Sequence, residues 1–163
     1  MADDESPRLT HVDEHGAAHM VDVTAKAVTV RSATASGRLM TTPEVVRLLR
    51  GEGVPKGDAL AVARIAGIQA AKRTPDLVPL CHPIAIHAVA VDLDVVDDGV
   101  RIRATVRTAD RTGVEMEALT CVAVAGLTLV DMVKSVDRSA VITDVRVEEK
   151  TGGRSGTWRR TVG

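Results

Sequence analysis

Aromatic residues are nearly absent from this sequence. The chain of 163 residues has no Phe, no Tyr and a single tryptophan, Trp158, although 45% of its residues are hydrophobic. Its core must therefore be built from Val, Ala, Leu, Ile and Met, which bury less apolar area per side chain than an aromatic ring. Such a chain gains from burying further surface between subunits, which is a weak indication of oligomerisation.

The chain also has few cysteines and almost no net charge. Cys81 and Cys121 are the only cysteines and form no CxxC pattern, and the net charge is −1. A near-neutral chain has no global field that attracts nucleic acid or an anionic membrane. No uncharged apolar run reaches the roughly 20 residues that span a bilayer. Without a visible signal peptide, we expect a cytoplasmic protein with reduced thiols and no nucleic-acid or membrane partner.

The order of patterned segments predicts one α+β domain. Residues 1–8 are expected to be a flexible N-terminus, 9–158 a single domain and 159–163 a C-terminal tail. The segments follow the order β-α-α-β-β-α-β, which is a ferredoxin-like arrangement with one extra helix. We expect an antiparallel sheet with helices packed on one face, leaving the other face for a partner subunit to cover.

Local signals predict where the elements begin and end. Thr42 followed by Pro43 is typical of a helix start, and Asp58 is a second N-cap candidate. We expect Pro75 to end that second helix. Alternating segments on either side of Asp97-Asp98-Gly99 predict a β-hairpin.

The long helix predicted over about residues 113–136 has an apolar middle and charged ends. Thr112 and Glu115 fit a capping box at its start. Asp131 opposes the helix dipole, and its i, i+3 spacing to Lys134 places the two side by side. A partly buried pair of this kind would tune each other's pKa for acid–base chemistry. At the other end, Glu117 could accept hydrogen bonds from a guanine-like ring.

A proline-stiffened loop carries Leu80, Cys81 and His82. Adjacent Cys and His are poorly placed to bind one metal, so a rigidly held histidine is the better functional interpretation, and an ordinary turn histidine the simpler one. His11, His15 and His19 have helical i, i+4 spacing, but Gly16 argues against a helix, and we expect a solvated loop there.

Basic residues occur as separated spots, each of which is ordinarily a solvated surface residue. Lys56 precedes a helix start, where backbone N–H groups favour anions. Residues 152–156, GGRSG, could form an anion-binding nest. If the spots converge, they build one local phosphate site. They are Lys26, Arg31, Lys56, Arg64, Lys72, Arg73, Lys150 and Arg154.

Four segments together resemble a known family. They are LTHVDEHGAAHMVDVTAKAVTVR, KGDALAVARIAGIQAAKRTPDLVPLCHPI, TGVEMEALTCVAVAGLTLVDMVKSVD and KTGGRSG, in this order. Over about residues 9–158 the chain resembles the cyclic pyranopterin monophosphate synthases of molybdenum-cofactor biosynthesis. The resemblance implies a homohexamer, a trimer of dimers, with active sites between subunits. The implied substrate is the small molecule 3′,8-cyclo-7,8-dihydro-GTP, and diphosphate is the implied by-product.

The resemblance also implies roles for individual residues. Asp131 and Lys134 match the catalytic pair. The matched substrate-binding positions are Lys26, Arg31, Lys56, Lys72, Leu80, Cys81, His82, Glu115, Met116, Glu117 and Lys150. The implied lyase chemistry requires no redox cofactor, and Mg²⁺ on the diphosphate is an additional expectation without a metal-ligand motif in the sequence.

Three other functions are compatible with the residues. The chain could be a non-catalytic oligomer that binds a guanine nucleotide or a pterin. It could be a metal hydrolase built on Cys81, His82 and the two glutamates. It could also be a structural oligomer whose charged helix ends are only caps and salt bridges.

Overall fold

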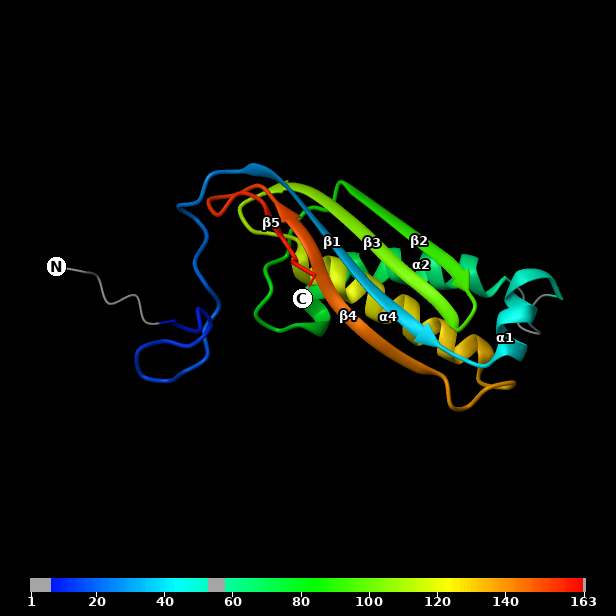
Figure 1. Ribbon diagram of the computed structural model, residues 1–163. Helices are drawn as coiled ribbons and strands as arrows, with labels where there is room; N and C mark the ends of the chain where they lie inside the picture. The colour runs from blue at the N-terminus through cyan, green and yellow to red at the C-terminus, as the bar shows by residue number, and fades with distance from the viewer. Residues whose placement is uncertain (1–6, 53–57, 163) are drawn as a thin grey trace.

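The computed structural model describes residues 7–52 and 58–162 and has the predicted α+β architecture (Figure 1). Five antiparallel strands form one sheet in the order β2-β3-β1-β4-β5. The first four are the ferredoxin-like strands, because β1 and β3 are central and the two β-α-β connections carry helices to one face. The strands are β1 (Thr29–Met40), β2 (Ala88–Val96), β3 (Gly99–Asp110), β4 (Val141–Thr151) and the short β5 (Trp158–Arg159).

Two long helices cover one face of this sheet. They are α2 (Ala59–Lys72) and α4 (Glu115–Val133), which pack against each other. α4 lies under β1, β3 and β4, and α2 lies under β2 (Figure 1). Three short helical segments complete the fold: α1 (Pro43–Arg47), the π-helical η1 (Leu48–Glu52) and α3 (Thr74–Leu77). The fold prediction is confirmed.

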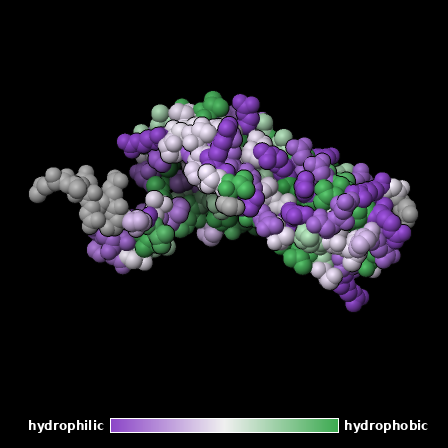
Figure 2. All heavy atoms as spheres, in the orientation of Figure 1, coloured by the Kyte–Doolittle hydropathy of each residue, from purple (hydrophilic) through white to green (hydrophobic). Residues whose placement is uncertain are grey.

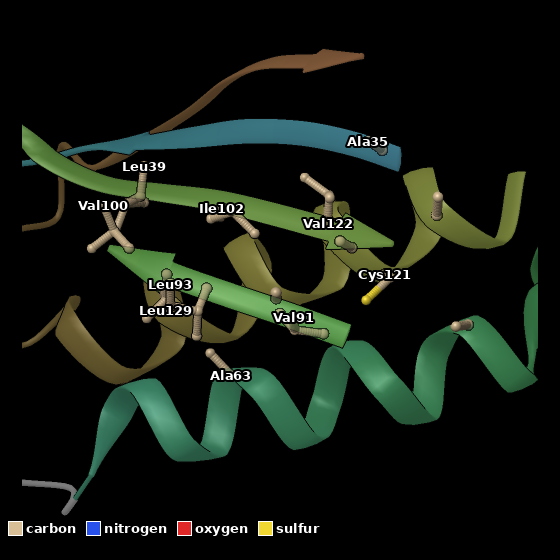
Figure 3. Packing of buried hydrophobic residues seen from close by; sticks show 14 of the residues in the cluster. Ala35, Leu39, Ala63, Val91, Leu93, Val100, Ile102, Cys121, Val122 and Leu129 are labelled. Carbon is tan, nitrogen blue, oxygen red and sulfur yellow. The ribbon is translucent and has the colours of Figure 1, made fainter. Parts of the chain in front are cut away.

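Small aliphatic side chains fill the space between the two layers (Figure 3). Gly67 of α2 lies so close to α4 that an added Cβ would stand 3.1 Å from the Cys121 sulfur. This close approach of helices explains how a core without aromatic rings reaches full packing. The largest fully buried side chains include Leu39, Val100, Ile102, Val122 and Leu129.

The opposite face of the sheet is polar. Arg101 and Arg103 of β3 stand beside Asp94 and Asp92 of β2 in the antiparallel register. Hydrophilic side chains cover much of the molecular surface over the sheet in Figure 2. A partner subunit on this face, which the sequence predicted in general terms, would therefore meet charges and not an apolar surface.

Two predicted helix starts are confirmed and two other local predictions are wrong. The Thr42 and Asp58 side chains accept hydrogen bonds from Val45 N–H and Ala61 N–H, as N-caps do. Pro75 does not terminate α2, which ends at Lys72, but lies in the first turn of α3, where proline is tolerated.

The predicted capping box at Thr112 is the second wrong prediction. α4 begins at Glu115 with Val114 as its N-cap, and no side chain caps it. Val114 is buried in the core, and this anchoring sets the start of the helix. Thr112 is left to line a pocket.

The hairpin prediction is confirmed. Val96 pairs with Gly99, so that Asp97 and Asp98 form the two-residue turn. Gly99 has a φ of 153°, and a side chain there would collide with the Leu39 carbonyl group of β1. The glycine therefore lets β1 approach the turn closely.

α4 also has the length and composition of a membrane-spanning helix, with a mean hydropathy of 1.7 over its most apolar window. Of that window, 56% is buried inside the protein. Because α4 is the central helix under the sheet, burial in the core accounts for its apolar sequence.

Candidate active site

The N-terminal end of α4 opens into a pocket with a volume of about 240 Å³. The pocket brings together three parts of the chain: the start of α4, the loop at residues 80–82 and the N-terminal segment before β1. Seven of the predicted substrate-binding residues line it: Lys26, Leu80, Cys81, His82, Glu115, Met116 and Glu117. We call it the acidic pocket because two glutamates lie side by side in its wall.

Glu117 is the most unusual group in the acidic pocket. Its side chain is only 3% exposed, and burial raises the pKa of its carboxyl group to about 7, helped by the nearby charge of Glu115. Burial and the charge of Glu117 also raise the pKa of the Cys81 thiol. At neutral pH, Glu117 is therefore able both to donate and to accept a hydrogen bond.

His82 has a fixed orientation. Its Nε2 atom lies 2.5 Å from the carbonyl oxygen of Val21. A carbonyl oxygen only accepts, so Nε2 must carry the proton and donate it. In the neutral imidazole, Nδ1 is then the acceptor, which is the atom available for a ligand or a proton.

A second pocket adjoins the first through Lys26, which lines both. Its wall contains Arg31 and the loop Gly153, Arg154 and Ser155, so we call it the cationic pocket. Lys150 of β4 donates a hydrogen bond to the Ser155 hydroxyl and holds this loop against the sheet. Three cationic side chains thus line a pocket next to two carboxylates.

Three glycines of the loop after β4 have left-handed backbone conformations. Gly152, Gly153 and Gly156 have φ values of 85°, 73° and 64°. Gly153 lies directly beside the Arg31 guanidinium, where an added Cβ would collide with it. The glycine therefore allows Arg31 and the loop to share one site.

The predicted catalytic pair lies at the opposite end of α4. Lys134 Nζ is 2.5 Å from Asp131 Oδ1, and the two side chains are 56% and 57% exposed. The predicted pairing is observed, but in a single chain the pair lies on the surface and is not partly buried. Fourteen residues of helix separate Asp131 from Glu117, which corresponds to about 21 Å.

Asp137, just beyond α4, has a structural role. Its carboxylate accepts hydrogen bonds from the Thr41 hydroxyl, the Thr42 N–H and the Ser139 hydroxyl and N–H. These bonds lower the pKa of Asp137 to about 2, with the Ser139 and Thr41 hydroxyls as the main causes. They also fasten the C-terminal end of α4 to the start of α1 (Figure 1).

One predicted residue lies apart from both pockets. Lys72 is exposed at the end of α2 and does not line either pocket among the described residues. Lys56 lies outside the described residues. Among the side chains that the structure describes, no three His, Cys, Asp or Glu residues gather into a metal-binding group.

Some residues of the acidic pocket were not expected from the sequence. Thr10, His11, Val21, Val23, Thr112 and Gly113 also line it. His11 was expected in a solvated loop, and its segment is indeed exposed, but its place in the pocket wall depends on contacts across the fold. The bond from His82 to Val21 spans 61 residues, and no local sequence pattern indicates it.

The fold and the two adjoining pockets define an α+β domain with a candidate small-molecule site. The MoaC family model matches residues 20–153, and the chain belongs to the MoaC family. The family predicted from the sequence blocks is therefore confirmed.

Similar proteins extend over nearly the whole chain. Cyclic pyranopterin monophosphate synthase of Streptomyces coelicolor is 70% identical over 97% of this chain and 93% of its own length. The protein of the same name from a Nocardioides species is 69% identical over 96% of this chain and 98% of its own length. Cyclic pyranopterin monophosphate synthase 2 of Mycobacterium tuberculosis is 60% identical over 98% and 95%. These names confirm the predicted activity, that of a lyase in molybdenum-cofactor biosynthesis, at the level of the family.

Proposed function

We propose that this chain converts 3′,8-cyclo-7,8-dihydro-GTP to cyclic pyranopterin monophosphate and diphosphate at a site shared between subunits. The observation that carries the proposal is the adjacency of the two pockets. Glu115 and Glu117 can accept hydrogen bonds from the N1–H and amino group of a guanine-derived ring. Lys26, Arg31 and Arg154 offer positive charge for the phosphate chain.

The two pockets divide the binding task. The ring enters the acidic pocket, where Met116 supplies an apolar surface and His82 Nδ1 an acceptor. Leu80 and Cys81 form the loop wall next to it. The triphosphate extends past Lys26 into the cationic pocket, with Lys150 holding the glycine loop in place. Lys56 and Lys72 belong to the same proposal as further phosphate-binding cations.

Lys134 and Asp131 carry the acid–base chemistry in this proposal. The reaction opens and rearranges the ring, after which a hydroxyl group attacks the α-phosphate and diphosphate leaves. Each step moves protons, which Lys134 donates or accepts while Asp131 holds its ammonium group in place. Positive charge from the cationic pocket stabilises the leaving diphosphate.

The distance between the two ends of α4 supports a shared site. The catalytic pair lies about 21 Å along α4 from Glu117, beyond the reach of a ligand bound at the acidic pocket of the same chain. We therefore propose that a second subunit brings its Asp131–Lys134 pair to this pocket, in a homohexamer arranged as a trimer of dimers.

Two further features belong to the proposal. Mg²⁺, which prefers oxygen ligands, would be held by the phosphate oxygens of the substrate. The enzyme would act in the cytoplasm, where its nucleotide-derived substrate is expected. Loss of diphosphate release in EDTA and its return with Mg²⁺ would support the first point, whereas an EDTA-insensitive rate would contradict it.

The experiment that tests the function is an assay with purified 3′,8-cyclo-7,8-dihydro-GTP. Diphosphate release is followed while the pterin product is identified by its mass. Equal amounts of diphosphate and pyranopterin support the proposal. Binding of the substrate without either product would contradict it and would favour the non-catalytic nucleotide- or pterin-binding oligomer.

A further inference from the structure

The corner between β3 and α4 is hydrogen-bonded to residues that line both pockets. It consists of Asp110, the last residue of β3, and Arg111. We refer to these two residues as the β3 corner. Thr112 and Gly113, which follow directly, line the acidic pocket. Any group that is attached to this corner therefore has its position set relative to the acidic pocket.

Arg111 attaches the N-terminal segment to the corner. Its Nε atom donates a hydrogen bond of 3.0 Å to the carbonyl oxygen of Lys26. Lys26 is the residue that lines both pockets among those the structure describes. The segment before β1 is largely exposed, and Lys26 closes a turn in which its N–H donates to the Val23 carbonyl oxygen. A bond to its backbone at Lys26 therefore fixes the point from which the lysine side chain reaches.

Arg31 is attached to the same corner. Its Nε atom donates a hydrogen bond of 3.1 Å to the carbonyl oxygen of Asp110. This bond uses the Nε atom of the guanidinium. The two terminal nitrogens of the same group lie beside Gly153 in the cationic pocket. Lys26 and Arg31, which come from different segments, are thus hydrogen-bonded to the two consecutive residues of the corner.

The Asp110 carboxylate stiffens the corner itself. It accepts hydrogen bonds from the N–H of Arg111 at 2.7 Å and from the N–H of Ala85 at 3.4 Å. Ala85 follows the loop that carries His82. The corner therefore links three segments of the site: the N-terminal segment, the start of β1 and the end of the 80–82 loop.

We propose that the β3 corner is a positioning element that sets Lys26 and Arg31 as a two-point clamp for a phosphate chain. Arg111 is the positioning residue for Lys26 and acts through the lysine backbone without touching the ligand. The identity of the ligand, a substrate triphosphate, rests on the proposed function. The clamp itself requires only a chain of phosphate groups.

Inorganic triphosphate is a probe that tests the clamp without the reaction. Its affinity is measured by calorimetry for the wild type, Arg111→Ala, Lys26→Ala, the double variant, Arg111→Lys and Arg107→Ala. Arg107 is exposed on β3, four residues before the corner, and controls for the loss of one positive charge. Size-exclusion chromatography checks that every variant keeps the wild-type assembly.

We expect Arg111→Ala and Lys26→Ala each to weaken binding about tenfold, the effect of one charged interaction. Arg107→Ala should weaken it by at most about twofold, as for an exposed charge. Since Arg111 acts through Lys26, the double variant should bind about as well as Lys26→Ala alone. Arg111→Lys, which keeps a donor, should recover most of the affinity.

Three results would overturn the proposal: no triphosphate binding by the wild type, equal affinities for Arg111→Ala and Arg107→Ala, or fully multiplicative losses in the double variant. The proposed function fails in a different way. If the wild type binds triphosphate with this pattern but releases no diphosphate from the cyclic substrate, the clamp stands and the synthase assignment falls.

Discussion

The two ends of α4 carry similar numbers of charged residues but are built differently. At the N-terminal end, Glu117 is 3% exposed and lies in a pocket walled by two other parts of the same chain. At the C-terminal end, the Asp131–Lys134 pair is more than half exposed. Among the charged residues that the structure describes at that end, Asp137 alone is buried, and its hydrogen bonds are structural.

The buried N-terminal end of α4 therefore has the features of a binding site, whereas the exposed C-terminal end carries the proposed reactive groups. The N-terminal end has already desolvated a carboxylate, which costs stability that a ligand can recover. The C-terminal end leaves its ion pair exposed to water, where such a pair contributes little to folding. Its chemistry therefore needs a second surface that excludes water, which is the reason for proposing a shared site.

The largest effect is expected at the exposed end. Lys134→Ala should lower diphosphate release by about 10²–10⁴-fold, the usual contribution of a general acid or base. Because Lys134 is exposed, the variant should keep its assembly and melting temperature. Arg138→Ala, an exposed cation four residues further on, is the control and should retain activity. Near-normal turnover by Lys134→Ala would remove the lysine from the mechanism.

The stability of the folded protein should depend on pH through Glu117, at the buried end of α4. The pKa of Glu117 is about 7 in the folded protein against 4.5 in the unfolded chain. Between these values the folded state binds the additional proton, so stability should fall as pH rises from about 4.5 to about 7, by roughly 3 kcal/mol in total. Glu117→Gln should abolish this slope and be the more stable protein at pH 8.

Denaturant unfolding of the wild type and Glu117→Gln across this pH range measures the difference. Glu44→Gln, at an exposed position in the first turn of α1, is the matched control and should keep the wild-type slope. Parallel curves for the wild type and Glu117→Gln would show that the carboxyl group is not desolvated.

The cationic pocket offers a smaller effect with a close control. Gly153→Ala places a Cβ against the Arg31 guanidinium and should raise KM about tenfold, with less change in kcat. Gly156→Ala has a similar positive φ of 64° but nothing within 4 Å of its added Cβ. Gly156→Ala therefore has the same strain of a side chain at positive φ but does not displace Arg31. Equal KM values for the two variants would contradict the role of Arg31 in binding.

The smallest effect concerns stability at the exposed end. Asp131→Asn removes an exposed ion pair and should change the free energy of unfolding by less than about 1 kcal/mol while it lowers activity. Asp137→Asn removes a buried, multiply bonded carboxylate and should destabilise the protein more. Denaturant melts of both variants compare them directly. If Asp131→Asn lost more free energy of unfolding than Asp137→Asn, the Asp131–Lys134 pair would have a structural role.

Local chemistry made much of the fold predictable from the sequence. The N-caps Thr42 and Asp58 and the turn before Gly99 each act within a few residues, and their predictions are confirmed. The capping box predicted at Thr112 was wrong because Val114 is buried in the core, and tertiary packing outweighed the local pattern. The predicted division into a flexible end, one domain and a tail stays a prediction.

The site was predictable only in part. The Asp131–Lys134 pair follows from helical spacing, and the family blocks indicated most residues of the acidic pocket. The contacts that position them join segments far apart in the chain, such as Arg111 to Lys26 across 85 residues. Such contacts depend on the fold and leave no periodic signal in the sequence.

The most direct test of a shared site is complementation between the two ends of α4. Glu117→Gln and Lys134→Ala are each expected to be inactive. They are mixed in equal amounts, dissociated and reassembled, so that some sites combine an intact acidic pocket from one chain with an intact lysine from another. Random assembly should restore about a quarter of the wild-type diphosphate release. No recovery in reassembled mixed oligomers would contradict the account, because each site would then be built from a single chain.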